Sequence, residues 1–275
     1  MIVSVIVPAC DAQSTIVRAI ESLRAQTLPD WEAIVVADDR FDYAGFLSGR
    51  MGLDHRLRFA TTGLARSGCH RARNVGLKLV RGDFVTQLDA DDRLAPGRFA
   101  ALVPLAKEHG AAADNMDVVA DETQERLYRP LGDISETAFL DLTSFMKLNA
   151  PLVPLIRRDF SLPRALGVEL AEDVVANIRL IDQIGRLPVA PEPSYIYCVR
   201  SGSIAHRRDS AERFEAAYTR YIDRLVDGDG FALTGASRAA ALKGLIAKRE
   251  LNRAFAGAAK VNPRLTFQEF ARAWV

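Results

Sequence analysis

The sequence predicts an α/β fold in which a mostly parallel, Rossmann-like sheet is flanked by helices and followed by a C-terminal helical extension. Two observations predict it. From residue 1 to about 95, apolar strand patterns alternate with helical patterns. Acidic residues stand directly after two of these strands, at 38–39 and 89–92, where parallel sheets of this kind bind their ligands. Beyond residue 206 the pattern is wholly helical, so we divide the chain into 1–205 and 206–275.

Each element follows from its own pattern. Apolar runs predict strands over 2–7, 31–37, 57–60, 83–88, 117–120 and 195–199, with Pro8 ending the first. Residues 127–132 would pair antiparallel, and 150–156, with two prolines, would be an extended loop or an edge strand. Helical spacing predicts helices over 11–26 (capped by Ser14 or Asp11), 66–79, 96–109, 172–184, 211–226, 237–256 and 266–274.

Composition restricts the class of protein. The 275 residues are 49% hydrophobic and 26% charged, which is typical of a globular chain with a full core. The net charge of +1 gives no global attraction for nucleic acid, so we expect no such partner. Three well-separated cysteines fit a reducing, cytoplasmic setting, and no apolar run approaches the length of a membrane span.

The acidic run at 89–92 follows an apolar strand. Carboxylates crowded at the buried end of a strand are costly unless a positive group lies beside them. Mg²⁺ or Mn²⁺ is such a group, and it is commonly held by one or two carboxylates and by substrate phosphates. We therefore expect a metal–diphosphate site here. A plainer alternative is that Asp92 caps a helix over 93–106.

Five blocks in one order resemble the inverting family 2 glycosyltransferases, which have the GT-A fold. They are VSVIVP followed by Asp11, SLRAQT before DWE, the pair Asp38-Asp39, ARNVG at 72–76, and LDADD at 88–92. The resemblance covers about residues 2–205. It implies a metal-dependent transferase that moves a sugar from a nucleotide-diphosphate sugar, with UDP favoured, to a hydroxyl of a sugar or lipid-linked glycan, in polysaccharide or glycoconjugate synthesis.

The same resemblance assigns residues to the donor nucleotide. The family's first strand and turn place Pro8 and Asp11 at the nucleotide, and Asp38 would accept the ring N–H of uracil. Arg73 would contact the diphosphate or, equally well, form a structural ion pair with Asp89. Caps of turns or helices are the structural alternative for the acidic residues.

The resemblance also assigns the metal motif and a closing loop. Asp91 would bind Mn²⁺ or Mg²⁺, and Asp89 would hold the ribose, the metal or its waters, with Ala90 between them. The segment after the last strand departs from the family pattern, because its basic residue is displaced by two positions. Arg200 or His206 would therefore contact the diphosphate.

The candidate base lies in LAEDVV at 170–175, which resembles the family's ED motif at the start of a helix. Direct displacement needs one carboxylate to take the proton of the acceptor hydroxyl. The resemblance assigns this role to Asp173, with Glu172 as a helper or a helix-start residue. Since the helix dipole favours acidic residues in a first turn anyway, a structural role is the alternative for both.

The C-terminal tail is basic. Residues 236–264 contain seven Lys or Arg residues and a single acid, Glu250. Such a tail would contact the anionic inner face of a membrane, pack on the catalytic domain or form a homodimer. Its apolar residues do not share one face, which favours packing or a dimer.

Two other functions stay open at this stage. A sugar nucleotidyltransferase also places carboxylates around a metal, although residues 8–15 lack the glycine-rich loop that it normally needs. A non-catalytic partner subunit that binds nucleotide-sugar would keep the donor site without using the base.

Overall fold

The computed structural model describes residues 1–149, 151–165, 167, 170–200, 209–262 and 265–274. Its strands are β1 (Val3–Ala9), β2 (Trp31–Ala37), β3 (Leu57–Thr61), β4 (Phe84–Gln87), β5 (Arg93–Leu94), β6 (Ala111–Ala120), β7 (Arg126–Tyr128), β8 (Ala138–Leu140), β9 (Leu155–Arg157) and β10 (Leu187–Val199). Its helices are α1 (Ile16–Arg24), α2 (Tyr43–Met51), α3 (Cys69–Leu77), α4 (Arg98–His109), α5 (Leu142–Lys147), α6 (Glu172–Ile184), α7 (Ser210–Val226), α8 (Gly235–Val261) and α9 (Phe267–Ala273).

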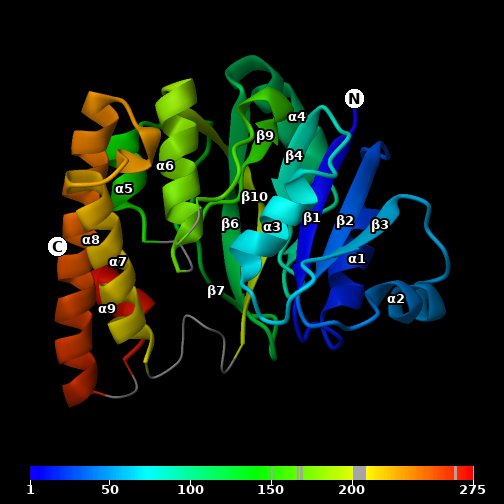
Figure 1. Cartoon of the computed structure of the whole chain (residues 1–275), viewed down its shortest axis with the longest axis horizontal. Helices are drawn as coiled ribbons and strands as arrows, with labels where there is room; N and C mark the ends of the chain where they lie inside the picture. Colours follow the sequence, from blue (N-terminus) through cyan, green and yellow to red (C-terminus); the bar gives the residue numbers. More distant parts are fainter. Residues whose placement is uncertain (150, 166, 168–169, 201–208, 263–264, 275) are drawn as a thin grey trace.

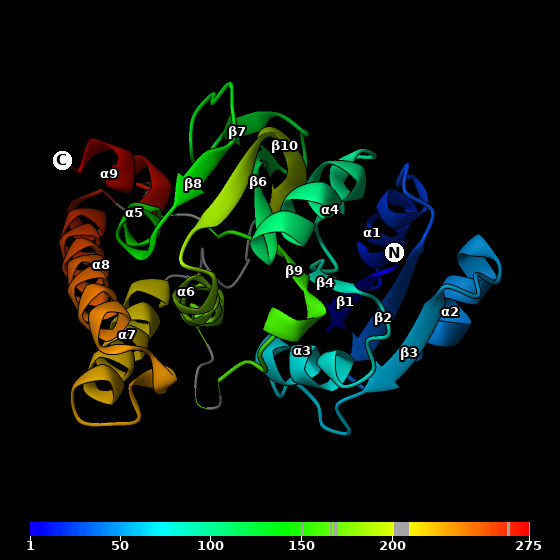
Figure 2. The same cartoon turned by 90° about the horizontal axis from the view of Figure 1, so that it is seen from above.

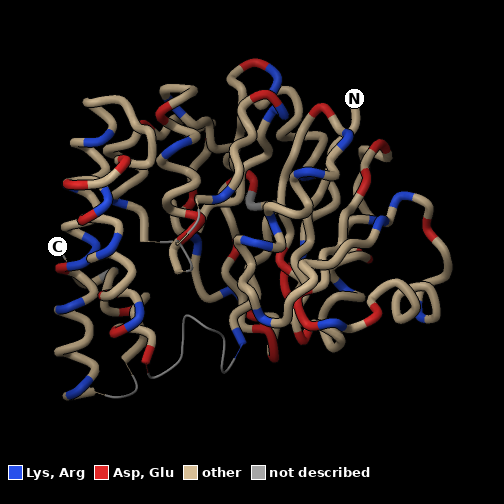
Figure 3. Tube along the Cα trace, in the orientation of Figure 1, with Lys and Arg blue, Asp and Glu red and all other residues tan. Residues whose placement is uncertain are grey.

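One sheet joins these strands in the order β3-β2-β1-β4-β9-β6-β10-β5, with β7 beside β6 and β8 beside β10. The first four are parallel, and so are β6 and β10, whereas β5, β7, β8 and β9 pair antiparallel. The α/β fold class is therefore confirmed, with a mixed sheet between helices (Figures 1 and 2). Figure 3 shows acidic residues gathering at the lower edge, where the parallel strands end.

Alternate residues of β1 serve the two faces of the sheet. Val3, Val5 and Val7 are fully buried in one core with α1 and α4. Ile6 points to the other face and packs with α3. A further core joins β6, β8 and β10 to α5, α6, α7 and α8. Period-two burial thus fixes α1 and α4 on one side and α3 on the other.

Helix α3 lies close against β1 because Gly76 has no side chain. A Cβ atom at this position would lie 2.5 Å from Cγ2 of Ile6. Arg73 lies about one turn earlier in the same helix and is buried. The close approach therefore sets the depth at which the Arg73 side chain enters the fold.

The predicted strand 31–37 and helix 172–184 have the bounds of β2 and α6, but other boundaries were wrong. β1 continues through Pro8, which pairs with Val36 of β2 and lies beyond the last β1–β4 pair. Helix α1 begins only at Ile16, and neither Asp11 nor Ser14 caps it with a side chain. The helix does not begin at Asp11 because this residue has a positive φ. A positive φ at Arg66 likewise keeps it out of α3.

The segment after the acidic run also differs from prediction. Arg93–Leu94 forms β5 and pairs antiparallel with β10, so no helix covers 93–106 and Asp92 is not its cap. Helix α4 begins at Arg98, with Gly97 as its N-cap. Strand β9 lies between β4 and β6 and is not an edge strand. Elements α2, β8 and α5 were not predicted.

The C-terminal extension is helical in its described part, although the expected boundary at 205/206 lies outside the described residues. Helix α8 packs against α5, α6 and α7, as expected for a packed helix. Arg253 pairs with Glu215 of α7 at 2.6 Å, and Lys248 is buried instead of solvated. None of the described helices combines the length and apolarity that crossing a membrane requires.

Candidate active site

The acidic run after β4 is tied to β10 through Asp92. Its buried carboxylate accepts hydrogen bonds from the Tyr195 hydroxyl and the Cys198 backbone N–H, both at 2.8 Å. Burial, together with the charges of Asp91 and Asp89, raises the pKa of Asp92 well above its usual range. Asp92 therefore fixes the loop that presents Asp89 and Asp91, while Ala90 between them is buried.

Arg73 joins the acidic run to the start of α6. Its guanidinium lies 2.5 Å from the Asp89 carboxylate and also forms an ion pair with Glu172. Glu172 in turn pairs with Arg164 at 3.0 Å, and Arg164 donates to the Gln87 side chain at 2.6 Å. The structure thus brings the predicted metal motif and the predicted ED motif together through one buried arginine.

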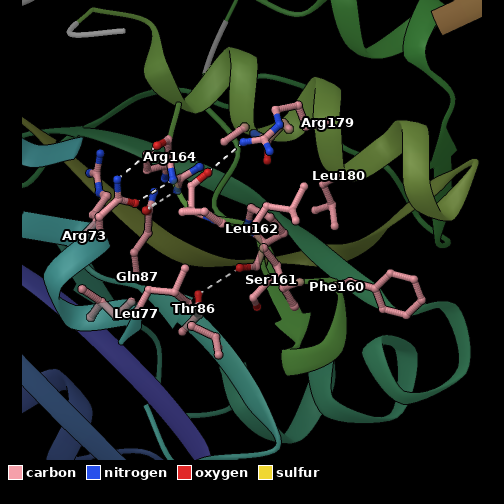
Figure 4. A pocket seen from close by; sticks show the side chains of 18 of the residues that line it. Arg73, Leu77, Thr86, Gln87, Phe160, Ser161, Leu162, Arg164, Arg179 and Leu180 are labelled. Carbon is pink, nitrogen blue, oxygen red and sulfur yellow. Dashed lines mark hydrogen bonds between the residues drawn. The ribbon is translucent and has the colours of Figure 1, made fainter. Parts of the chain in front are cut away.

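Figure 4 shows Arg73, Arg164 and Gln87 converging on one side of a small cavity. The cavity has a volume of about 60 Å³ and lies between α3, β4 and α6. It is too small for a nucleotide, since ligand pockets usually span roughly 300–1,000 Å³. Burial, and the neighbouring charge of Arg73, lower the pKa of Arg164 to about 10. The network therefore has the features of a buried structural support.

Asp91 carries the second ion pair of the acidic run. Its carboxylate contacts the Arg200 guanidinium at 2.5 Å, and Arg18 donates to its backbone carbonyl at 2.7 Å. Burial and the charge of Asp89 raise the pKa of Asp91, whereas Arg200 lowers it. Arg200 thus lies at the acidic run, and its predicted contact with the diphosphate stays a prediction. His206 is outside the described residues.

The residues present fit a divalent, oxygen-preferring metal. Asp89 and Asp91 offer hard carboxylate oxygens, and their side chains are 36% and 30% exposed. Asp89 raises the pKa of Asp91, so the two negative charges oppose each other and a cation would relieve both. Each carboxylate also contacts an arginine, which a metal would have to displace at least in part.

A different acidic group lies after β1. Cys10, Asp11 and Asp39 place potential ligand atoms within 4.8 Å of one another. Asp11, however, pairs with Arg66 at 2.6 Å, and Asp39 accepts from the Tyr43 hydroxyl at 2.7 Å. These contacts order the loops after β1 and β2. The neighbouring Pro8 is half-buried.

Asp38 lies at the end of β2, where we predicted recognition of the base. Its buried carboxylate accepts from Thr62 at 2.7 Å, from Ser67 at 2.5 Å and from the Gly68 backbone at 2.9 Å. Although burial opposes the shift, these hydrogen bonds lower the pKa of Asp38. Asp38 is therefore ionised and orders the 62–68 loop. The Ser67 backbone N–H contributes a fourth hydrogen bond, so a ring N–H would have to share or replace one of these donors.

Asp173 lies in the first turn of α6, beside the network but outside it. It is half-buried and lines a cavity of about 230 Å³. The preceding Ala171 adopts a left-handed conformation that turns the chain into the helix. Glu172 is held between two arginines, whereas Asp173 faces a space that a ligand can enter.

Sequence reasoning missed two groups that organise this site. Arg164 follows Pro163 in a loop without a motif, and Tyr195 was noted only as the start of a strand. Both act through contacts with residues far away in the chain: Tyr195 contacts Asp92 103 positions earlier, and Arg164 contacts Gln87 77 positions earlier. No local signal identifies such partners.

Comparisons with known proteins identify the family of this chain. The family model described as Glycosyl transferase family 2 matches residues 4–156. The succinoglycan biosynthesis protein ExoO of Rhizobium meliloti is 30% identical over 239 residues, covering 81% of this chain and 68% of that protein. A β-1,3-glucosyltransferase of Escherichia coli, WfgD, is 37% identical over 91 residues, which is 33% of this chain and 35% of that protein.

Solved structures show the same fold. The chain superposes on Staphylococcus aureus TarS 1-349 in complex with UDP-GlcNAc with a TM-score of 0.72, at 21% identity, covering 98% of this chain and 77% of that one. The mixed sheet, with its acidic loops at the carboxyl ends of parallel strands, defines a protein with the GT-A fold. The chain belongs to glycosyltransferase family 2.

Proposed function

We propose that the protein transfers a sugar from a UDP-sugar to a hydroxyl acceptor by direct, inverting displacement that depends on a divalent metal, in the synthesis of a polysaccharide or glycoconjugate. The observation that carries the proposal is the bridge from Asp89 through Arg73 to Glu172, which joins the acidic run after β4 to the first turn of α6, where Asp173 also lies. Support comes from WfgD, whose name specifies UDP-Glc and a diphosphoundecaprenol acceptor, and from the TarS complex with UDP-GlcNAc.

In this proposal the donor lies across the carboxyl ends of β1, β2 and β4. Asp38, ionised and held by the 62–68 loop, accepts the uracil N–H. A bound Mn²⁺ or Mg²⁺ at Asp91 and Asp89 would neutralise charge on the diphosphate that leaves. Arg200 and Arg73, already at these carboxylates, supply guanidinium groups whose planar donors match phosphate oxygens.

Asp173 then acts as the base. It would accept the proton of the acceptor hydroxyl while the oxygen attacks the anomeric carbon from the face opposite the diphosphate. Glu172, enclosed by two arginines, is a positioning residue in this proposal, because its carboxylate orients Arg73 and fixes the first turn of α6. This refines the helper role that we predicted from sequence.

The first experiment is a calorimetric titration of UDP with and without Mn²⁺, on the wild type and on Asp91→Asn. Binding that needs both the metal and Asp91 would support the donor site, and screening of UDP-sugars for transfer would follow. If neither UDP, GDP nor dTDP binds, the donor proposal is wrong.

A second experiment separates catalysis from binding. Asp173→Asn should keep the affinity for UDP and lower turnover by about 10²–10⁴-fold, the usual contribution of a general base. Unchanged turnover would exclude Asp173 as the base. Membership of the family disfavours a sugar nucleotidyltransferase, and turnover by the wild type would exclude a non-catalytic partner subunit.

A further inference from the structure

The cavity beside Asp173 lies where the catalytic domain meets the C-terminal helices. It has a volume of about 230 Å³, and half of its described lining residues belong to α7, α8 or α9. Figures 1 and 2 show α7 and α8 beyond α6, on the side away from β1. The candidate base therefore faces a space that the helical extension closes.

The walls of this cavity are rich in aromatic side chains. Six of its sixteen lining residues are aromatic, against 8% of the whole chain. Phe214 and Tyr218 stack with ring centroids 5.9 Å apart, and Phe255 meets Phe267 edge to face at 5.4 Å. Of these four, Tyr218 is buried and the other three are half-buried, so part of each of those rings remains accessible. Such rings offer flat apolar surfaces to a ligand.

The polar groups of the cavity point to an uncharged ligand. Lys248 donates to the Leu148 carbonyl at 2.5 Å and to the Asn149 side chain at 3.3 Å, which uses two of its three N–H donors. Among the described residues that line the cavity, Lys248 and Asp173 are the charged ones, so this part of the lining carries no net charge. A neutral ligand with hydroxyl groups suits a lining with one positive and one negative side chain better than an anion does.

One wall residue connects the cavity to the donor site. Tyr197 of β10 lines the cavity, and Tyr195 and Cys198 of the same strand donate hydrogen bonds to Asp92. Strand β10 therefore joins the cavity wall to the acidic run. A ligand in the cavity would be near both the candidate base and the donor diphosphate.

We propose that this cavity binds one neutral sugar ring of the acceptor, with an apolar face of the ring on the aromatic side chains and a hydroxyl towards Asp173. Pockets for drug-sized ligands span roughly 300–1,000 Å³, so about 230 Å³ suits a single ring. A lipid chain would place hydrocarbon against the Asp173 carboxylate and the Gln268 amide, which is costly. The inference rests on the proposed function, since it takes Asp173 as the base.

The test uses methyl glycosides of glucose, galactose and N-acetylglucosamine as probes. Their binding to the full chain with UDP and Mn²⁺ is measured by saturation-transfer NMR. Phe267→Ala should raise the Kd of the bound glycoside about tenfold, equivalent to ~1.4 kcal/mol. Phe270→Ala is the matched control, because Phe270 lies in the same helix and also contacts Phe255 but does not line the cavity. Phe267→Trp, which retains an aromatic face, should restore binding.

The outcomes are distinct. Loss of glycoside binding in Phe267→Ala, with UDP affinity and thermal unfolding unchanged, supports the proposal. If no glycoside binds the wild type, if both alanine variants weaken binding equally, or if 1-octanol displaces the glycoside while a second glycoside does not, the proposal is wrong. UDP titrations run in parallel report on the donor site alone, so failure of the donor proposal would be seen separately.

Discussion

Arg73 offers a sharp test of the site, because it pairs with both Asp89 and Glu172. Breaking a buried ion pair by removing one partner costs roughly 3–5 kcal/mol. In Arg73→Met, Glu172 keeps its contact with Arg164. The Asp89 carboxylate costs little when it is left unpaired, because 36% of its side chain is exposed and water can solvate it. We therefore expect the lower end of that range, about 3 kcal/mol of unfolding free energy.

The assay is urea unfolding followed by circular dichroism and by tryptophan fluorescence, whose transitions should coincide. The double variant Arg73→Met/Glu172→Gln no longer leaves a buried carboxylate without its partner. The unfolding free energy lost in this double variant should be at least about 1 kcal/mol smaller than the sum of the losses in the two single variants. If the loss in the double variant equals the sum of the two single losses to within roughly 0.5 kcal/mol, the ion pair between Arg73 and Glu172 is refuted. Arg253→Met, which breaks an exposed pair with Glu215, is the control and should cost no more than about 1 kcal/mol.

Three further predictions concern other groups. Burial lowers the pKa of Lys248 to about 8, so between pH 8 and 10.5 the unfolded chain binds more protons and stability should rise by up to about 3 kcal/mol. Urea titrations at several pH values should show a smaller rise of the unfolding free energy with pH in Lys248→Met than in the wild type. Tyr195→Phe removes a donor to buried Asp92 and should lower unfolding free energy by about 1–3 kcal/mol in the same assay. Arg200→Ala should strengthen Mn²⁺ binding without nucleotide, measured by calorimetry, by freeing Asp91; weaker binding would contradict this.

Local patterns sufficed where an element is defined by its own residues. The run 31–37 is apolar except for Glu32 and forms a strand buried along its whole length. The helix over 172–184 has acidic residues in its first turn and a glycine after its last, and these signals fixed both ends. The motif at 72–76 also gave the position of Arg73, because an arginine in that block has to point to the sheet once Gly76 packs on Ile6.

Long-range pairing could not be predicted in the same way. Residues 155–157 contain no signal for a place between β4 and β6, since strand order depends on which partner edges are available. The helix-cap alternative for Asp92 was wrong for the same reason, because its partners Tyr195 and Cys198 lie more than 100 residues later. Helix capping depends on residues that are close in sequence, whereas Asp92 makes its hydrogen bonds to the distant strand β10.

The ion pairs change how the acidic run should be interpreted. We first expected a metal because crowded carboxylates need a positive partner, yet Asp89 and Asp91 already have Arg73 and Arg200. The free-energy cost of crowding these carboxylates is therefore, taken alone, weak evidence for a bound metal. The pKa of Asp91 nevertheless stays raised, because burial and the charge of Asp89 outweigh Arg200. A cation at the carboxylates would release the arginines to bind an anion such as a diphosphate. Metal and nucleotide should therefore strengthen each other's binding by the same factor, as linkage requires.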